Sequence, residues 1–250
     1  MQRRIAVLVV VGAWMMGLVG GPAVAHAAEY LVNQDYETLK KGEFEVEMYN
    51  DFNFAEADHS GSYNSKHQVE LEYGVLDRLQ LAYYDVYTWD RPKDWERDAF
   101  KIEVKYRFAE AGQWPVDVAL YTEYENPDGP RAAHSDVVEQ KLILSKAFGR
   151  WHLIANAIVE KQVNTGSHWD YEYTAGVSYD LTPKTHVEIE VKEGLGDSKD
   201  FDFSGRQLLY LIPSLSMTIT PHVRLLVGPA FGMTRASDDL QLKSIMEVEF

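Results

Sequence analysis

The sequence predicts an all-β protein, a closed antiparallel transmembrane β-barrel of about twelve strands with both termini in the periplasm. Three observations predict it: apolar and polar residues alternate at period two, the connections alternate between short and long, and the last strand ends on an aromatic residue. After residue 28, no stretch approaches the 18 apolar residues of a membrane helix. The 250-residue chain has no cysteine, which excludes disulfides and thiolate metal sites.

The first 27 residues have the layout of a secretory signal peptide. Arg3 and Arg4 precede the apolar run 5–19, and residues 23–27 offer small-x-small cleavage sites. The run falls short of the roughly 20 residues that a membrane span needs. We therefore expect residues 1–27 to be cleaved after export, residues 28–41 to form a periplasmic N-terminal lead or a short helix, and residues 42–250 to form the barrel.

The strands are predicted one by one from alternation. In the segment 100–108, for example, Phe100, Ile102 and Val104 alternate with charged residues, a pattern that an amphipathic helix does not show. Each segment is roughly 10 residues long or shorter, which suits a tilted strand crossing an apolar band. The expected strands are 44–52, 68–73, 78–88, 100–108, 116–121, 137–146, 151–161, 171–180, 187–192, 206–215, 222–231 and 240–250.

The connections alternate in length along the whole chain. After the even strands they are tight, at 75–77, 109–115, 148–150, 181–184 and 220–221. After most odd strands they are longer and more polar, at 55–64, 90–97, 126–135 and 194–204. Short periplasmic turns and long outer loops are typical of outer-membrane barrels, whereas a soluble β-sandwich, the alternative, has no reason to alternate.

The ends of the strands carry the remaining signals. Met246, Val248 and Phe250 share one face of the last strand, which indicates an assembly signal read by the barrel-assembly machinery. Five tryptophans near strand ends indicate aromatic girdles at the lipid interface: Trp89, Trp95, Trp114, Trp151 and Trp169.

If the apolar face meets lipid, the ionisable face lines the lumen. The first, second and last strands then form an acidic wall of Glu45, Glu47, Asp51, Glu70, Glu72, Glu247 and Glu249. Opposite it stands a basic wall of Lys101, Lys105, Arg107, Lys141, Lys192 and Arg224. Two interpretations stay open: a charge network that fills a narrow barrel, or an acidic surface that attracts cations and repels anions.

Enzymatic and metal sites have weaker support. A lipid hydrolase of this fold needs a serine, a histidine and an orienting polar group on the lipid-facing side of adjacent strands. The neighbours His134 and Ser135, and Ser167 and His168, point to opposite faces if extended. Asp58, His59 and His67 are more simply solvated than metal-bound. We expect no enzyme activity, no cofactor, no metal, and, from a net charge of −15, no nucleic-acid partner.

The segments 41–47 (KGEFEVE) and 72–81 (EYGVLDRLQL), together with the terminal Phe250, resemble a broad group of proteobacterial outer-membrane barrels. Many of these are described as proteins of the phenol meta-degradation pathway or as transporters. The resemblance implies a barrel in the outer membrane of a Gram-negative bacterium and passage of small, aromatic or hydrophobic solutes. It implies no catalytic residues.

The favoured function is a channel or transporter for an unknown small solute, embedded in outer-membrane lipid and cation-leaning through its acidic wall. A structural or surface-interaction barrel whose lumen is filled by its own side chains is one alternative. An outer-membrane lipid hydrolase is another.

Overall fold

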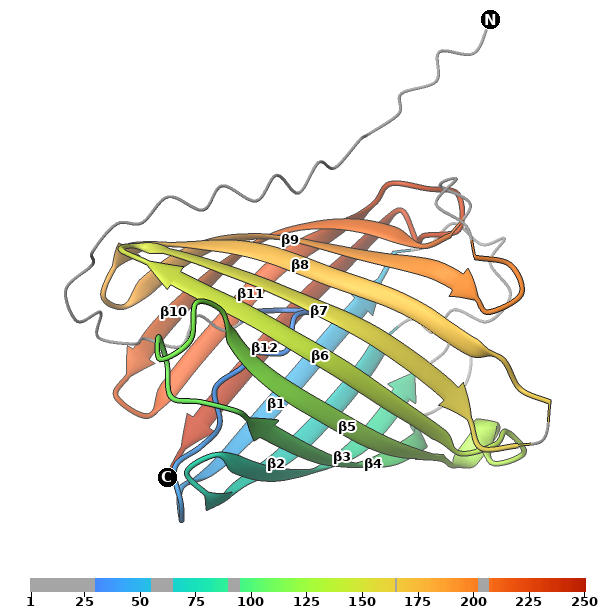
Figure 1. Ribbon diagram of the computed structural model, residues 1–250. Coiled ribbons are helices and arrows are strands. Elements are labelled where there is room, and N and C mark those ends of the chain that lie inside the picture. Colours follow the sequence, from blue (N-terminus) through green and yellow to red (C-terminus); the bar gives the residue numbers. More distant parts are fainter. Residues whose placement is uncertain (1–29, 55–64, 90–94, 165, 202–206) are drawn as a thin grey trace, which may run out of the picture.

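The computed structural model describes residues 30–54, 65–89, 95–164, 166–201 and 207–250. The predicted signal peptide, Asp58 and His59 lie outside these residues. The described chain forms a closed antiparallel barrel in which every strand pairs with its neighbours in sequence and the first pairs with the last (Figure 1). Its strands are β1 (Phe44–Asn53), β2 (Ser65–Leu76), β3 (Leu79–Trp89), β4 (Trp95–Arg107), β5 (Asp117–Pro127), β6 (Val137–Phe148), β7 (Trp151–Gln162), β8 (Trp169–Thr182), β9 (Thr185–Asp197), β10 (Leu209–Thr220), β11 (Val223–Gly232) and β12 (Leu240–Glu249).

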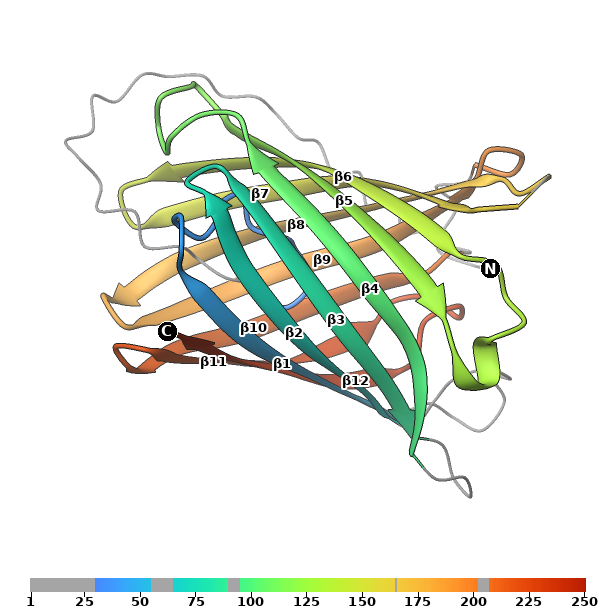
Figure 2. The same cartoon turned by 90° about the horizontal axis from the view of Figure 1, so that it is seen from below.

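The predicted closed antiparallel barrel is confirmed. β1 pairs with β12 from Glu45 opposite Glu249 to Asn53 opposite Gln241, so the sheet has no free edge there (Figure 2). The chain end is part of this seam, because the Phe250 N–H donates to the Phe44 carbonyl at 2.9 Å and the two rings lie 5.9 Å apart. Closure matters because an unpaired strand edge is not tolerated in lipid.

Burial is reversed relative to a water-soluble protein. Along β4, Ile102 and Val104 are 48% and 40% exposed, while Glu103 and Lys105 are 0% and 5% exposed. The apolar side chains form the outer surface and the ionisable ones lie inside the barrel. This arrangement suits a sheet surrounded by hydrocarbon, and it follows from the alternation that the sequence displays.

The connections follow the predicted alternation except between β4 and β5, where the connection at 108–116, predicted to be tight, is longer than the one at 163–168 between β7 and β8. Short turns join β2 to β3, β6 to β7, β8 to β9 and β10 to β11 at one end, together with the 108–116 connection between β4 and β5. The longer connections lie at the other end, where residues 129–131 form one turn of 3₁₀-helix. One strand prediction was displaced: the tenth strand is Leu209–Thr220, not 206–215, because its alternation is weak around Pro213.

The N-terminal segment differs from its prediction. Residues 30–41 form neither a helix nor a free tail, but an irregular strap inside the barrel, seen as the blue coil enclosed by the strands in Figures 1 and 2. Among the described residues, no helix is both long and apolar enough to span a membrane.

Polar groups of two strands hold the strap. The Glu190 carboxylate on β9 accepts hydrogen bonds from the backbone N–H groups of Leu31, Val32 and Asn33 at 2.8, 3.0 and 2.9 Å, and from the Asn33 side chain at 2.8 Å. On β7, the Asn156 side-chain oxygen accepts from the Gln34 N–H at 2.6 Å. These side-chain oxygens thus satisfy backbone N–H groups of the strap that would pair with a neighbouring strand in a sheet.

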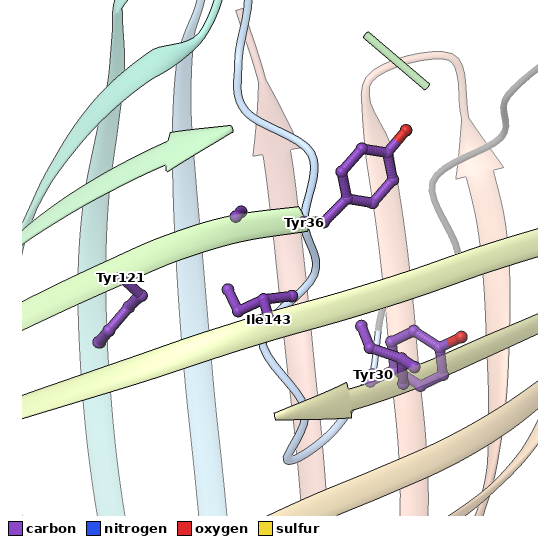
Figure 3. Packing of buried hydrophobic residues seen from close by; sticks show 6 residues of the cluster. Tyr30, Tyr36, Tyr121 and Ile143 are labelled. Atoms are coloured by element: carbon purple, nitrogen blue, oxygen red, sulfur yellow. The ribbon is translucent and has the colours of Figure 1, made fainter. Parts of the chain in front are cut away.

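Apolar side chains complete the attachment. Tyr30 and Tyr36 pack with Tyr121 and Ile143, which point inward from β5 and β6 (Figure 3). Leu31 packs against an inward apolar patch of the opposite strands, formed by Tyr210, Ile212, Leu226, Ala230 and Ile245. The inner surface of the barrel is therefore not uniformly polar. Its apolar side chains pack against those of the strap, and this packing removes both from water.

Candidate functional site

The strap divides the lumen into two cavities. One, of about 540 Å³, lies toward the long connections, and the other, of about 230 Å³, lies toward the short turns. We call them the loop-side and turn-side cavities. Tyr30, Asn33, Gln34 and Tyr49 line both. Any path through the barrel must therefore pass the strap.

The turn-side cavity is strongly acidic. Among the described residues, eight acidic and three basic side chains line it. The strand registers create this density, because Glu45 stands opposite both Glu72 and Glu249, while Glu47 stands opposite both Glu70 and Glu247. All seven residues of the predicted acidic wall lie on the three adjacent strands β12, β1 and β2. Five of them line this cavity, and Glu70 lies fully buried beside them.

Two tyrosines on and beside this wall, Tyr49 and Tyr84, donate hydrogen bonds to inward-facing carboxylates. The Tyr49 hydroxyl contacts Glu70 at 2.9 Å and also Glu47. The Tyr84 hydroxyl lies 2.6 Å from Glu103, a fully buried acid on β4. Sequence reasoning did not single out Glu103, Tyr49 or Tyr84. The alternation places them inward, but only the register shows that they meet the wall.

The side chains of the acidic wall offer the oxygen ligands that a hard cation prefers. Oxygens of Glu45, Glu47 and Glu72 lie within 4.8 Å of one another, and so do those of Glu70, Glu72 and Glu103. Carboxylate oxygens without nitrogen or sulfur suit Ca²⁺ or Mg²⁺ better than zinc. The expectation of no metal site concerns the histidines, whereas the sequence alone shows these acids only as a charged surface.

The loop-side cavity is balanced in charge. Among the described residues, five acidic and five basic side chains line it, many of them in ion pairs. Asp51, the seventh residue of the predicted wall, lies here and pairs with Lys243 at 2.7 Å. It does not join the other six acids, because it lies near the end of β1 that leads into a long connection, whereas Glu45 and Glu47 lie toward the other end.

The predicted basic wall is likewise dispersed. Lys101, Lys141 and Lys192 line the loop-side cavity, where they pair with Glu123, Glu139 and Glu172 at 2.8, 2.9 and 2.9 Å. Lys105 and Arg224 line the turn-side cavity. Arg107 lies at the turn end, bound to the Asp77 carbonyl at 2.8 Å and to Glu110 at 2.9 Å. These residues do not form one continuous surface.

The serine and histidine neighbours considered from the sequence do not assemble. The Ser135 hydroxyl accepts from the Asn164 side chain at 2.7 Å, and the Ser167 hydroxyl donates to the Gln162 carbonyl at 2.7 Å. At the turn end, His152 and His186 both bind the Asp180 carboxylate, at 3.1 and 2.7 Å.

No family model matches this sequence, and no curated protein matches it. Solved structures match its fold. The COG4313 outer membrane channel from Pseudomonas putida F1 has a TM-score of 0.60 at 14% identity, over 88% of this chain and 100% of that one. The KdgM porin in complex with disordered oligogalacturonate has a TM-score of 0.57 at 9% identity, over 82% and 98% of the two chains. The NanC porin has a TM-score of 0.54 at 12% identity, with the same coverage. The chain therefore has the fold of outer-membrane β-barrels.

Proposed function

We propose that the protein is an outer-membrane channel for small solutes, narrowed by the strap at residues 30–41. The observation that carries this proposal is the pair of polar cavities in line along a closed barrel whose outer face is apolar. The solved structures that share this fold, the COG4313 channel and the KdgM and NanC porins, support the proposal.

We propose an orientation in the membrane from the lengths of the connections. The short turns and both barrel termini would face the periplasm, and the long connections the cell exterior. In this proposal the signal peptide at residues 1–27 directs export, and Met246, Val248 and Phe250 are read during assembly. A solute would then enter through the balanced cavity and leave through the acidic one.

We propose a preference for cations. The turn-side cavity combines an excess of acidic side chains with a low-dielectric wall, so its field favours positive ions and opposes negative ones. The phenol meta-pathway resemblance suggested aromatic or hydrophobic solutes. The charged lining of both cavities favours polar ones instead.

Planar-bilayer recording of the refolded protein tests this selectivity. In a salt gradient the wild type should show a reversal potential of the cation-selective sign, and Glu47→Gln combined with Glu72→Gln, both in the lining of the turn-side cavity, should move it toward zero. The matched control, Glu139→Gln with Glu172→Gln, removes the same charge from the balanced cavity and should move it less. An anion-selective wild type would contradict the proposal.

A structural barrel with a filled lumen is the second candidate. The hydrogen bonds and apolar packing of the strap favour it, because they occupy the centre of the barrel. A wild type that never conducts, while the strap-free variant described below does, would favour this function.

A further inference from the structure

Three hydrogen-bonded side chains lie together on the outer face of the barrel, near the end with the long connections. Asn50 of β1 stands opposite His67 of β2, and Ser65 is two residues before His67 on the same strand. Their strand neighbours Lys66 and Gln68 line the loop-side cavity, so Ser65 and His67 point outward. The His67 Nδ1 lies 2.7 Å from Asn50 Oδ1, and its Nε2 lies 3.0 Å from Ser65 Oγ.

The order of these contacts fixes the protonation of neutral His67. An amide oxygen only accepts hydrogen bonds, so Nδ1 carries the proton that it donates to Asn50. Nε2 is then unprotonated and accepts the hydroxyl proton of Ser65. A serine hydroxyl on Nε2 and an orienting oxygen on Nδ1 are the relations that activate a serine nucleophile, whatever the fold around them.

We propose that these residues catalyse hydrolysis of a carboxylic ester in a membrane lipid, with Ser65 as nucleophile, His67 as general base and Asn50 as positioning residue. The site meets the requirement stated for a barrel hydrolase: serine, histidine and orienting group lie on adjacent strands and face lipid. It lies outside the barrel, so it is independent of any path through the lumen.

The surroundings suit an acyl chain. The rings of Phe52 and Trp95 lie 5.5 and 4.6 Å from the His67 ring, and these two side chains are 41% and 58% exposed. Aromatic side chains at this level favour the boundary between acyl chains and head groups. Ser65 itself is only 3% exposed, so its hydroxyl must become accessible from the lipid side before it can attack an ester.

The reaction balances in two acyl transfers. Ser65 Oγ bonds to the ester carbonyl carbon while its proton passes to His67 Nε2. The carbon–oxygen bond to the lipid alcohol then breaks, and the alcohol leaves with that proton. Water next gives a proton to Nε2 as its oxygen attacks the acyl-serine. The returning proton restores the Ser65 hydroxyl, and a fatty acid is released.

The shared chemistry of the substrate is a long-chain acyl ester at a membrane surface. Such esters occur in glycerophospholipids and in acylated lipopolysaccharide, and separate assays distinguish them. The refolded full-length protein is incubated with mixed micelles of diacyl phosphatidylethanolamine, or with purified lipopolysaccharide, and released fatty acid is measured by mass spectrometry. Release from either arm supports the proposal and identifies the source.

Variants tie any activity to this site. Ser65→Ala and His67→Ala should each lower fatty-acid release by about 1,000-fold or more. Ser135→Ala removes a hydroxyl that is bonded to Asn164 and should leave release unchanged. Folding of each variant is checked by its heat-modifiable mobility on gels. An alkyl fluorophosphonate provides a second measurement, because it should modify Ser65 in the wild type and not in His67→Ala.

Asn50 acts through His67, so its test separates positioning from structure. Asn50→Ala should lower kcat by about 100-fold with little change in KM, and Asn50→Asp should restore it, because a carboxylate accepts the same Nδ1 proton. A folded wild type that releases no fatty acid from either substrate and is not modified at Ser65 would overturn the proposal. Release that survives Ser65→Ala would also overturn it.

Discussion

Glu190 shows how a single residue organises the lumen. Its carboxylate accepts four hydrogen bonds from the strap, three of them from consecutive backbone N–H groups. Hydrogen bonds to a charged acceptor are stronger than neutral ones, and they satisfy donors that would otherwise be buried without a partner. The sequence showed Glu190 as one more inward acid, because its donors lie 157 to 159 residues away in the chain.

Replacing Glu190 therefore loosens the strap. We expect Glu190→Ala to lower the free energy of unfolding by about 3 kcal/mol, since several buried donors lose their acceptor. It should also raise single-channel conductance. Unfolding in urea and bilayer recording measure the two effects. Glu193→Gln on the same strand is the control. The Glu193 carboxylate accepts a hydrogen bond from the Tyr173 hydroxyl at 2.5 Å, not from the strap, so this variant should change conductance little. Equal conductance of Glu190→Ala and wild type would contradict this role.

At the scale of elements, regular and irregular segments differ in how well the sequence predicts them. The strands were predicted within a few residues, because burial on one face imposes alternation on each one. The strap was not, because residues such as Asn33, Gln34 and Asp35 look like a solvated tail. The acceptors of Asn33 and Gln34 lie on β9 and β7, and the strap packs against Tyr121 on β5. These partners are far away in the sequence, and only the closed barrel brings them to the strap.

The strap also carries a titratable group. Burial, and then the nearby Glu37 carboxylate, raise the pKa of Asp35 to about 7, against the opposing effect of Lys105. Because this pKa is raised, the strap packed inside the barrel favours the protonated form of Asp35. The stabilisation is complete below the ordinary pKa of 3.8 and is lost as pH rises through about 7.

Conductance should accordingly rise as the pH is raised from about 5 to about 8, because this range includes the raised pKa of Asp35 and the strap loosens as Asp35 loses its proton. Asp35→Asn should remove the part of this dependence that Asp35 causes and hold the strap as at low pH. Bilayer recordings at constant salt concentration measure it. A pH dependence that is the same in Asp35→Asn and wild type would show that other groups cause it.

At the scale of the whole molecule, the fold rests on one orientation: apolar side chains outward and ionisable side chains inward. The alternation in the sequence carried this information, as Ile102 and Glu103 illustrate with exposed fractions of 48% and 0%. The division of the lumen into an acidic and a balanced cavity was not predictable in the same way. It depends on strand registers, which place Asp51 opposite Lys243 but Glu47 opposite both Glu247 and Glu70.

The absence of native cysteine allows a direct test of orientation. In lipid vesicles, a single cysteine at Lys101 should react quickly with a small, water-soluble thiol reagent, because it faces the loop-side cavity. A cysteine at Ile102 should react slowly with that reagent and quickly with a lipid-soluble one. The reverse order of reactivity would place the faces of β4 the other way round.

The central claim is that the strap limits passage through an otherwise open barrel. The most direct measurement compares single-channel conductance of the wild type with that of a variant in which residues 30–38 are replaced by glycine and serine. We predict a small, cation-selective conductance for the wild type and one several-fold larger for the variant. Two proteins that fold alike and conduct equally, or both remain silent, would contradict the claim.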